Sequence, residues 1–282
     1  MTTVRSADAT VWRRFLQRRG SVAALIVILV IALACALSPL FGLDGTTSDM
    51  SDRWAGPSAA HLLGTDNLGR DYLARVLSGG GISLFVGFSS ALAATLIGMI
   101  AGLTAGYFGG IVDDLLMRLV DLLSAIPWML LVIVASVFFR PGLWTMVLII
   151  GTLSWMTTAR LVRAETLSVR ERTFVGYASF IGVRSPLVIL RHVLPAVVPT
   201  IIVAATATIS GAILTESALS FLGLGIQAPL ASWGSLLTTA QGSLQKAPLL
   251  AVVPGLLIAT TVFCVNVVGN GIRAAVTRED ER

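Results

Sequence analysis

Few residues in this sequence could carry out chemistry, and they are not spaced for any common reaction. Nucleotide phosphates are held by a Gly-Lys-Ser/Thr loop, but the only lysine, Lys246, stands in Gln-Lys-Ala. The two histidines, His61 and His192, are far apart in the chain, and no His-Glu-x-x-His or paired-cysteine pattern occurs. A Gly-x-Ser-x-Gly elbow is missing as well. We therefore expect an all-α chain with no catalytic residue, no metal site and no cofactor of its own.

One acid, Glu216, lies close to a long apolar run. A carboxylate at the centre of a bilayer would cost roughly 2.5 to 3.5 kcal/mol, so we expect Glu216 beside a water-filled path or near the outer surface. Seven-residue spacing places Thr208 with Thr215, and Ser210 with Ser217, on neighbouring faces of the same segment. This polar side would either line a path for a polar solute or join neighbouring helices by hydrogen bonds, and the sequence favours neither.

The elements that position these residues are membrane helices. Only 12% of the residues are charged and the mean hydropathy is +0.87, whereas soluble domains carry roughly 25% charged residues. A span needs about 20 apolar residues to cross about 30 Å of hydrocarbon. Six uncharged intervals are long enough: Arg19 to Asp44, Arg75 to Asp113, Asp121 to Arg140, Arg140 to Arg160, His192 to Glu216 and Lys246 to Arg273. We predict an integral membrane protein of about six transmembrane helices. The uncharged stretch from Glu216 to Lys246 is too polar to face lipid and is expected to be a loop, partly re-entrant.

Basic residues fix the expected orientation, because cytoplasmic loops hold more Lys and Arg. With the N-terminus inside, the outside keeps only five of the 20 basic residues, namely Arg53, Arg70, Arg75, Arg140 and Lys246. Both termini are therefore predicted to be cytoplasmic. The asymmetry explains the high pI, so we expect the lipid bilayer and no nucleic acid as a partner. Cys35 and Cys264 lie in predicted spans and are expected to pack there without a disulfide.

The predicted organisation follows from these intervals. It comprises a cytoplasmic segment 1–20, a first helix 21–41, an extracytoplasmic loop 42–81, a core 82–272 with five further spans and a cytoplasmic loop 162–194, and a cytoplasmic tail 273–282. The second helix, 82–106, carries small residues at four-residue spacing, which let another helix approach closely: Ser90, Ala94, Gly98, Gly102 and Gly106.

The third predicted helix, 119–139, follows a short inside turn marked by Asp113, Asp114 and Arg118. Pro127 should bend this helix, because proline has no N–H and frees a carbonyl. The bend would be either a hinge used in gating or a static kink. The fourth and fifth helices are predicted at 142–161 and 195–221.

The loop between the fourth and fifth helices is rich in arginine. Within it, residues 166–181 read as a helix, and Gly182 is placed to stop it. Charges every few residues prevent this segment from spanning the membrane. It would lie on the membrane surface or dock into a partner protein.

Three stretches of the sequence resemble a known family. The first is His61-Leu-Leu-Gly-Thr-Asp-Asn-Leu-Gly-Arg-Asp71, with Arg75 and Gly81-Ile-Ser-Leu84 after it. The second is Arg191-His-Val-Leu-Pro195, and the third is Glu216-Ser-Ala-Leu-Ser-Phe-Leu-Gly-Leu-Gly225, followed by Ser232-Trp-Gly234. The chain resembles, from about Trp12 to Arg273, the dipeptide, oligopeptide and nickel permease subunits of ATP-binding-cassette importers. It is most similar to the second of the two permeases in such systems.

The resemblance implies a type I importer permease fold with a cytoplasmic coupling helix between helices four and five. Gly182 and Leu194-Pro195 fall in register with the family pattern. Gly176-Tyr177-Ala178 stands where Glu-Ala-Ala is usual, and His192 where isoleucine is usual. The implied ATPase-docking residues are Phe174, Val175, Gly176, Tyr177, Ala178 and Gly182.

The resemblance also implies partners and a location. The partners are a second homologous permease, two ATPase subunits or domains that bind ATP and Mg²⁺, and an extracytoplasmic substrate-binding protein. The location is a bacterial cytoplasmic membrane. The expected cargo is a dipeptide or oligopeptide, with nickel or haem import by the same machinery as the alternative. A stand-alone secondary transporter or channel is the rival from another class. It would need buried ion-coupling acids or an inverted repeat, and neither is clear in the sequence.

Overall fold

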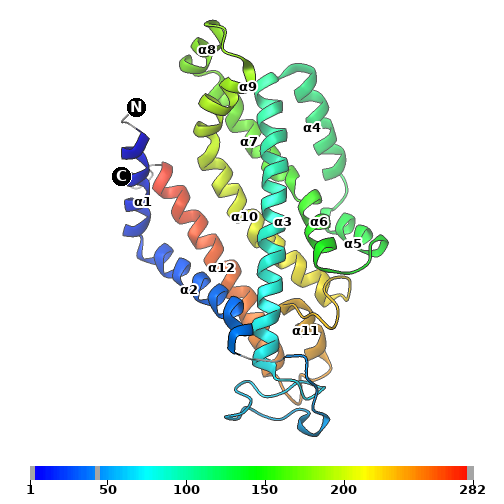
Figure 1. Ribbon diagram of the computed structural model, residues 1–282. Coiled ribbons are helices and arrows are strands. Elements are labelled where there is room, and N and C mark those ends of the chain that lie inside the picture. The colour runs from blue at the N-terminus through cyan, green and yellow to red at the C-terminus, as the bar shows by residue number, and fades with distance from the viewer. Residues whose placement is uncertain (1–3, 42–44, 278–282) are drawn as a thin grey trace.

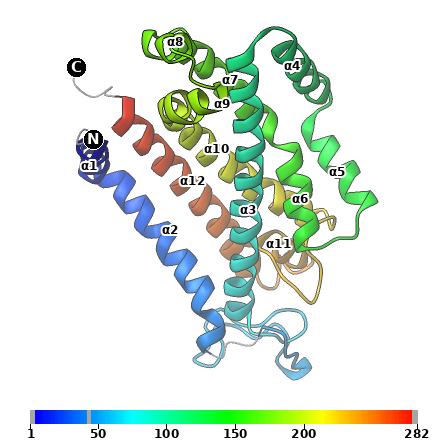
Figure 2. The same ribbon diagram turned by 45° about the horizontal axis from the view of Figure 1, so that its top comes forward.

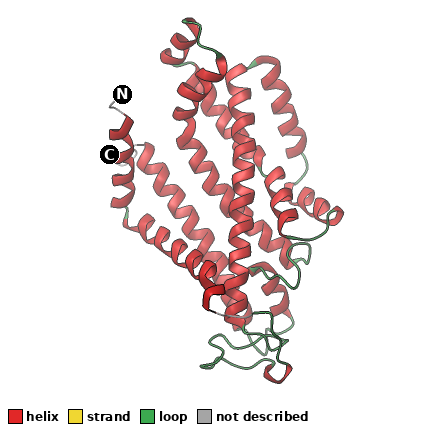
Figure 3. Cartoon of the chain, in the orientation of Figure 1, coloured by secondary structure: helices red, strands yellow, loops and turns green. Residues whose placement is uncertain are grey.

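The computed structural model describes residues 4–41 and 45–277, and within these residues no strand occurs (Figure 3). The all-α prediction is thus confirmed. The helices are α1 Val4–Gln17, α2 Arg19–Leu37, α3 Tyr72–Phe108, α4 Gly110–Ser124, α5 Trp128–Phe138, α6 Leu143–Leu153, α7 Trp155–Arg170, α8 Thr173–Phe180, α9 Ser185–Val188, α10 Leu194–Phe221, α11 Trp233–Gln241 and α12 Leu249–Thr277. A π-helical turn, Ile189–Val193, joins α9 to α10.

Five helical stretches of the described chain are long and apolar enough to cross a membrane. They are Arg19–Leu40, Tyr72–Phe108, Leu143–Arg170, Ser185–Phe221 and Leu249–Val276. A sixth span results if α4 and α5, which meet at a bend of 79°, count as one broken span. The prediction of about six transmembrane helices is confirmed in this sense.

Helix α3 is the central helix of the bundle (Figure 1). Its 37 residues extend over about 55 Å, which exceeds the roughly 30 Å of hydrocarbon in a bilayer. The predicted row of small residues on α3 packs tightly against α7. A Cβ on Gly98, Gly102 or Gly106 would come within 2.6 to 2.8 Å of atoms of α7, so these positions hold the two backbones close together.

The predicted extracytoplasmic loop 42–81 is too long, because α3 begins ten residues earlier, at Tyr72. Asp71 caps the helix by accepting a hydrogen bond from the Ala74 N–H at 2.8 Å. The first turns of α3 are held by the segment around α11: Trp233 Nε1 donates to the Val76 carbonyl at 3.1 Å. The last ten residues of the predicted loop are therefore the end of a helix that is longer than the membrane is thick.

The third predicted helix, 119–139, has the wrong start, and its expected inside turn is helical. Asp113, Asp114 and Arg118 lie within α4. Charged residues fit in this helix because α4 runs along α7, where Arg163 binds Asp113 and Arg160 binds Asp121. The predicted bend at Pro127 is confirmed: this proline caps α5 at the break between α4 and α5.

The single helix predicted over 166–181 is also wrong. Helix α7 continues from the fourth span to Arg170, and α8 begins only at Thr173. The Arg172 N–H bonds the Val169 carbonyl at 3.1 Å, which ends α7 and turns the chain by a tight corner. The predicted stop is confirmed, since Gly182 follows α8 with a φ of 82° and donates to the Ser179 carbonyl.

The segment between Glu216 and Lys246, predicted as a partly re-entrant loop, contains the helix α11. Ser232 caps α11 and exchanges hydrogen bonds with Ser235, a reciprocal arrangement known as a capping box. Gly234 packs directly on the backbone of Ser217 in α10. The segment therefore inserts between α10, α3 and α12 and does not extend freely.

The first and last spans pack against each other. Ala24 and Ile28 of α2 form a buried cluster with Cys264 and Val265 of α12. The predicted N-terminal segment 1–20 is mostly the helix α1, which the sequence did not indicate, and the predicted first helix 21–41 corresponds to α2 and a short 3₁₀ turn that ends at Phe41. Within the predicted tail 273–282, α12 continues to Thr277, and residues 278–282 lie outside the described chain.

The two ends of the bundle differ. Helices α1 and α8 and the C-terminal end of α12 lie at one end, and residues 45–71 lie at the opposite end with α11 (Figures 1 and 2). This arrangement matches an even number of membrane crossings.

Candidate functional site

Helix α8 projects from the end of the bundle where α7 and α9 meet (Figure 1). It has two distinct sides. Val175 and Ala178 are almost fully buried and pack into a cluster with Val188 and Val193. On the other side, the exposed fractions of Phe174, Tyr177 and Phe180 are 45%, 66% and 89%. Three exposed aromatic side chains on one short projecting helix form an apolar surface that a partner protein could cover.

The sequence-predicted docking residues therefore divide between the two sides of α8. Phe174 and Tyr177 are on the exposed side, whereas Val175 and Ala178 face the chain's own core. Gly176 has open space where a Cβ would stand, and Gly182 forms the turn after the helix. Phe180, the most exposed aromatic residue of α8, was missed. Its spacing of three from Tyr177 and six from Phe174 is the helical signal that could have identified it.

A cavity of about 440 Å³ lies between α7, α10 and the break between α4 and α5. Two helix interruptions meet at this cavity, one at Pro127 and the other at Ser154 between α6 and α7. Small residues of α10 leave the space open, and Arg160 contributes the one charged side chain of its lining. The hydroxyl groups of the lining belong to Ser124, Ser154, Thr157, Thr158 and Thr208.

Of the five residues predicted to line a path, only Thr208 borders this cavity. Ser210 accepts a hydrogen bond from Asn266 Nδ2 at 3.0 Å and so faces α12. Thr215 donates to the Gly211 carbonyl of its own helix, and Ser217 is buried under Gly234. Polar residues of α10 thus point in several directions, because their spacing does not follow one helical face.

Glu216 is fully buried among serine hydroxyls. Ser83 of α3 donates to its Oε2 at 2.9 Å, and Ser220 donates to its Oε1 at 2.7 Å. Each serine in turn accepts a backbone N–H: Ser83 from Trp233 at 3.1 Å and Ser220 from Ile226 at 3.0 Å. The carboxylate therefore organises the segment after α10 and does not border the cavity.

The lining residues that the sequence analysis missed carry a weak signal. Ala204, Thr208 and Gly211 recur at spacings of four and three, which places small side chains on one face of α10. Arg160 gave no comparable signal, because it was one of many arginines near the cytoplasmic loop. Its bond to Asp121 Oδ1 at 2.9 Å became visible only when α4 and α7 were placed side by side.

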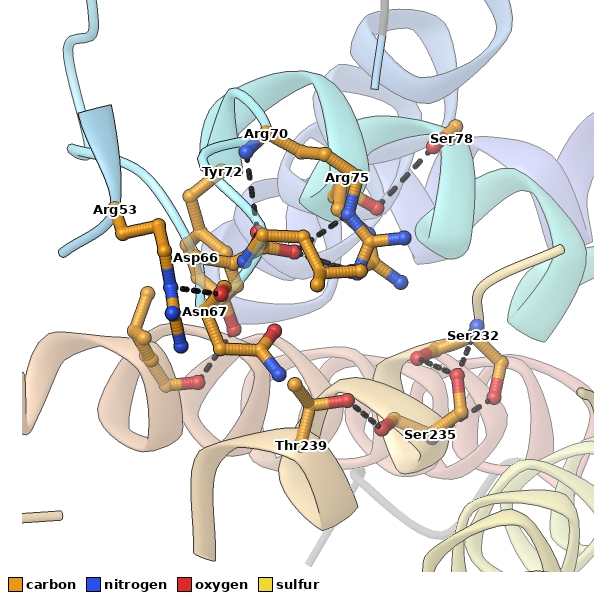
Figure 4. Close-up of polar contacts among 12 residues, drawn as sticks. Arg53, Asp66, Asn67, Arg70, Tyr72, Arg75, Ser78, Ser232, Ser235 and Thr239 are labelled. Carbon is orange, nitrogen blue, oxygen red and sulfur yellow. Dashed lines mark hydrogen bonds and ion pairs between the residues drawn. The ribbon is translucent and has the colours of Figure 1, made fainter. Parts of the chain in front are cut away.

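A polar cluster around Asp66 holds together the end of the bundle that lies opposite α8 (Figure 4). Asp66 is fully buried, and its Oδ2 accepts hydrogen bonds from Arg70 Nε at 2.8 Å and from Arg75 Nη1 at 2.5 Å. Burial disfavours the charged carboxylate, but the bonds from Arg70, the Leu68 N–H and Arg75 outweigh it and hold the pKa of Asp66 below its usual range. Tyr72 donates to the Leu250 carbonyl, which ties the start of α3 to α12.

Comparison with known protein families shows which family the chain belongs to. Residues 94–279 match the family described as binding-protein-dependent transport system inner membrane component. The chain belongs to this family. Residues 9–57 also match the N-terminal transmembrane domain of oligopeptide transport permease C, so both parts of the permease agree with the resemblance noted in the sequence.

Relatives of this permease span nearly all of it. The oligopeptide transport system permease protein OppC of Escherichia coli strain K12 is 40% identical over 95% of this chain and 90% of its own. The glutathione transport system permease protein GsiD of Pectobacterium atrosepticum is 39% identical over 97% and 91%. The dipeptide transport system permease protein DppC of Bacillus subtilis strain 168 is 35% identical over 94% and 83%.

The fold of the permease is shared with a solved structure. The inward-facing MetNI methionine ABC transporter superimposes on 70% of this chain and 94% of its own, with a TM-score of 0.58 and 18% identity. The type I importer permease fold predicted from the resemblance is therefore confirmed.

Proposed function

We propose that this permease is a membrane subunit of an ATP-driven importer that carries peptides into the cell. The relatives named above transport oligopeptides, dipeptides and glutathione by name, and glutathione is a tripeptide. Their near-complete coverage of the chain supports a peptide cargo over nickel or haem.

The observation that carries the proposal is the exposed aromatic surface of α8. Phe174, Tyr177 and Phe180 would seat in an ATPase subunit, while Val175 and Ala178 fasten the same helix to the permease core. Helix α8 is joined to α7 through two residues and to α10 through α9, so a movement of the partner would be passed to both spans. Two ATPase subunits or domains would bind ATP and Mg²⁺ on behalf of this chain.

The cavity between α7 and α10 would form this subunit's share of the transport path. Its hydroxyl groups and Arg160 suit the amide and carboxylate groups of a peptide, and its apolar walls suit varied side chains. A second permease would complete the path, and a binding protein would deliver substrate at the end formed by residues 45–71. The orientation that places α8 in the cytoplasm follows the distribution of arginine.

A stand-alone transporter is the rival function, and Glu216 is the residue that would favour it. Such a transporter needs an acid that exchanges ions with a water-filled path. Glu216 is enclosed by Ser83, Ser220 and α11, and it does not line the cavity, which favours a structural role.

Co-purification tests the proposal. We would isolate the tagged permease from its native membrane and compare Tyr177→Asp combined with Phe180→Asp against the wild type. These residues are exposed, so the variant should fold, whereas a change at the buried Ala178 would disturb the core. Leu62→Asp, at a 64% exposed residue of the opposite end, is the matched control.

The expected result is that an ATPase and a second permease accompany the wild type and the Leu62 variant, and that the ATPase is lost from the α8 variant. Purification of the wild type alone, with solute uptake in vesicles without ATP, would overturn the importer proposal. Uptake of a labelled tripeptide, with nickel and haem as competitors, then tests the cargo separately.

A further inference from the structure

Helix α1 combines a buried aromatic residue with exposed apolar and basic ones. Phe15 is 3% exposed and packs on the end of α12, where its ring would meet a Cβ on Gly271 at 3.2 Å. Trp12 stacks on Phe15 with ring centroids 5.8 Å apart, yet 58% of Trp12 is exposed. Leu16 is exposed to 48% on the same side of the helix. An apolar strip thus extends outward from the contact with α12.

The direction of α1 differs from that of the spans. Figure 2 shows α1 nearly end-on, whereas α2, α3 and α12 run across the view. Only Arg18 separates α1 from α2, whose apolar stretch begins directly after Arg19. Helix α1 therefore lies at the edge of the bundle, in a direction different from that of the spans, next to the residue where the apolar stretch of the first span begins.

Basic residues lie on the other faces of α1, at Arg13 and Arg14, and at the first residue of α2, Arg19. Arg13, Arg14 and Arg19 have no ion pair with another side chain of the described chain. In the sequence, no acid occurs between Asp8 and Asp44. A helix with Trp and Leu on one side and Arg on the other is typical of helices that lie in the membrane interface.

We propose that α1 lies in the cytoplasmic interface of the membrane and binds anionic phospholipid headgroups. Trp12 and Leu16 insert among the upper parts of the acyl chains, and Arg13, Arg14 and Arg19 contact the phosphates. The contact of Phe15 with α12 then fastens a lipid-anchored helix to the last span. The inference rests on the proposed orientation of the permease, which places α1 at the cytoplasmic leaflet. That leaflet carries a negative surface potential because of its anionic lipids.

Lipid retention tests this inference on the permease as it is isolated. The protein is placed in nanodiscs of equal parts phosphatidylglycerol and phosphatidylcholine, extracted mildly, and the retained lipids are identified by native mass spectrometry. The variant Arg13→Gln, Arg14→Gln, Arg19→Gln should lose the preference for phosphatidylglycerol, roughly fivefold for each arginine removed. The triple lysine variant should keep most of the preference. Arg53→Gln with Arg140→Gln, at exposed arginines outside α1, is the matched control and should keep it fully.

The alternative that the test must separate is neutralisation of these arginines by the acidic stretch Glu279, Asp280 and Glu281, which lies outside the described residues. If this stretch neutralised the arginines, replacing its three acids by amides would raise phosphatidylglycerol retention several-fold, and that result would overturn the proposal. An unchanged preference in the triple glutamine variant would overturn it too. The assay needs no ATPase and no substrate, so failure of the importer proposal would show in uptake and co-purification, and failure of this one in lipid retention.

Discussion

The hydroxyl of Ser83 on α3 donates a hydrogen bond to the Glu216 carboxylate on α10, and the two residues are 133 positions apart in the chain. The same hydroxyl oxygen accepts the N–H of Trp233, so one small side chain joins α3, α10 and α11. This contact gives the first prediction.

Ser83→Ala should lower the stability of the permease by about 1 to 3 kcal/mol, because it leaves a buried carboxylate oxygen and a buried N–H without their partner. Unfolding can be followed with a thiol-reactive dye, since Cys35 and Cys264 are both free and buried. Ser89→Ala, on the same helix, is the control and should hardly shift the midpoint. Equal midpoints for the two variants would contradict a structural role for the Ser83 contact.

Gly102→Ala should destabilise the contact between α3 and α7. Its Cβ would stand 2.6 Å from the Ala159 carbonyl oxygen and 2.7 Å from Val162 Cβ, and overpacking of this kind costs about 1 to 3 kcal/mol. Gly81→Ala on the same helix meets no atom within 4 Å and should leave stability equal or slightly higher. The dye assay compares the unfolding midpoints of the two variants. A midpoint for Gly81→Ala that is lower than that of Gly102→Ala would argue against close packing of α3 on α7.

Gly211→Phe should block peptide uptake and leave the protein folded. Gly211 borders the cavity, and no neighbouring atom lies within 4 Å of the position that a Cβ would take there, so a phenyl ring would occupy the path. Gly255→Phe on α12 also enters open space, but it lies away from the cavity and is the control. Uptake by the assembled transporter is the measurement. If uptake by the Gly211 variant matched that of the control, the cavity would not belong to the path.

Acid should loosen the loop 45–71 through Asp66. The folded protein holds the pKa of Asp66 below the ordinary 3.8, so this carboxylate stabilises the fold fully above that value. The stabilisation is lost as the pH falls below 3.8 and through the lower pKa of the folded state. Hydrogen-exchange protection of the loop should therefore fall in this window and remain level between about pH 5 and pH 7.

Asp66→Asn is the test of that assignment. It should remove most of the pH dependence and lower protection at neutral pH, because Arg75 is buried and loses its carboxylate partner. Asp52→Asn is the control, since the side chain of Asp52 is 54% exposed and reaches only His61, at 3.9 Å. A protection profile of the Asp66 variant that still fell below about pH 4 would assign the effect to another group.

The sequence predicted the features that depend on local composition. Long uncharged intervals indicated the spans, the spacing of Gly98, Gly102 and Gly106 indicated a close helix contact, and Gly182 indicated the end of α8. Each of these depends on residues within one segment: the length of apolar chain, the absence of a side chain, or a positive φ.

The features that were mispredicted depend on partners far along the chain. Asp113 suggested a turn because its partner, Arg163, is 50 residues away on α7. Glu216 was expected beside a water-filled path or near the outer surface, and the sequence did not indicate its bond to Ser83, because Ser83 lies on α3, 133 residues away. Val175 and Ala178 could not be told from the exposed side of α8, since eight residues show too little periodicity. The cluster that buries them also draws on α3, α7 and α10, as well as on α9 and the turn after it.

The pairing of the first span with the last has a consequence for biosynthesis. Ala24 and Ile28 of α2 pack against Cys264 and Val265 of α12, so α2 enters the membrane long before its partner has been translated. Until α12 leaves the ribosome, the face of α2 that carries Ala24 and Ile28 lacks this partner. A chain truncated before α12 would leave that apolar face of α2 permanently uncovered, which would favour its association with other apolar helices in the membrane.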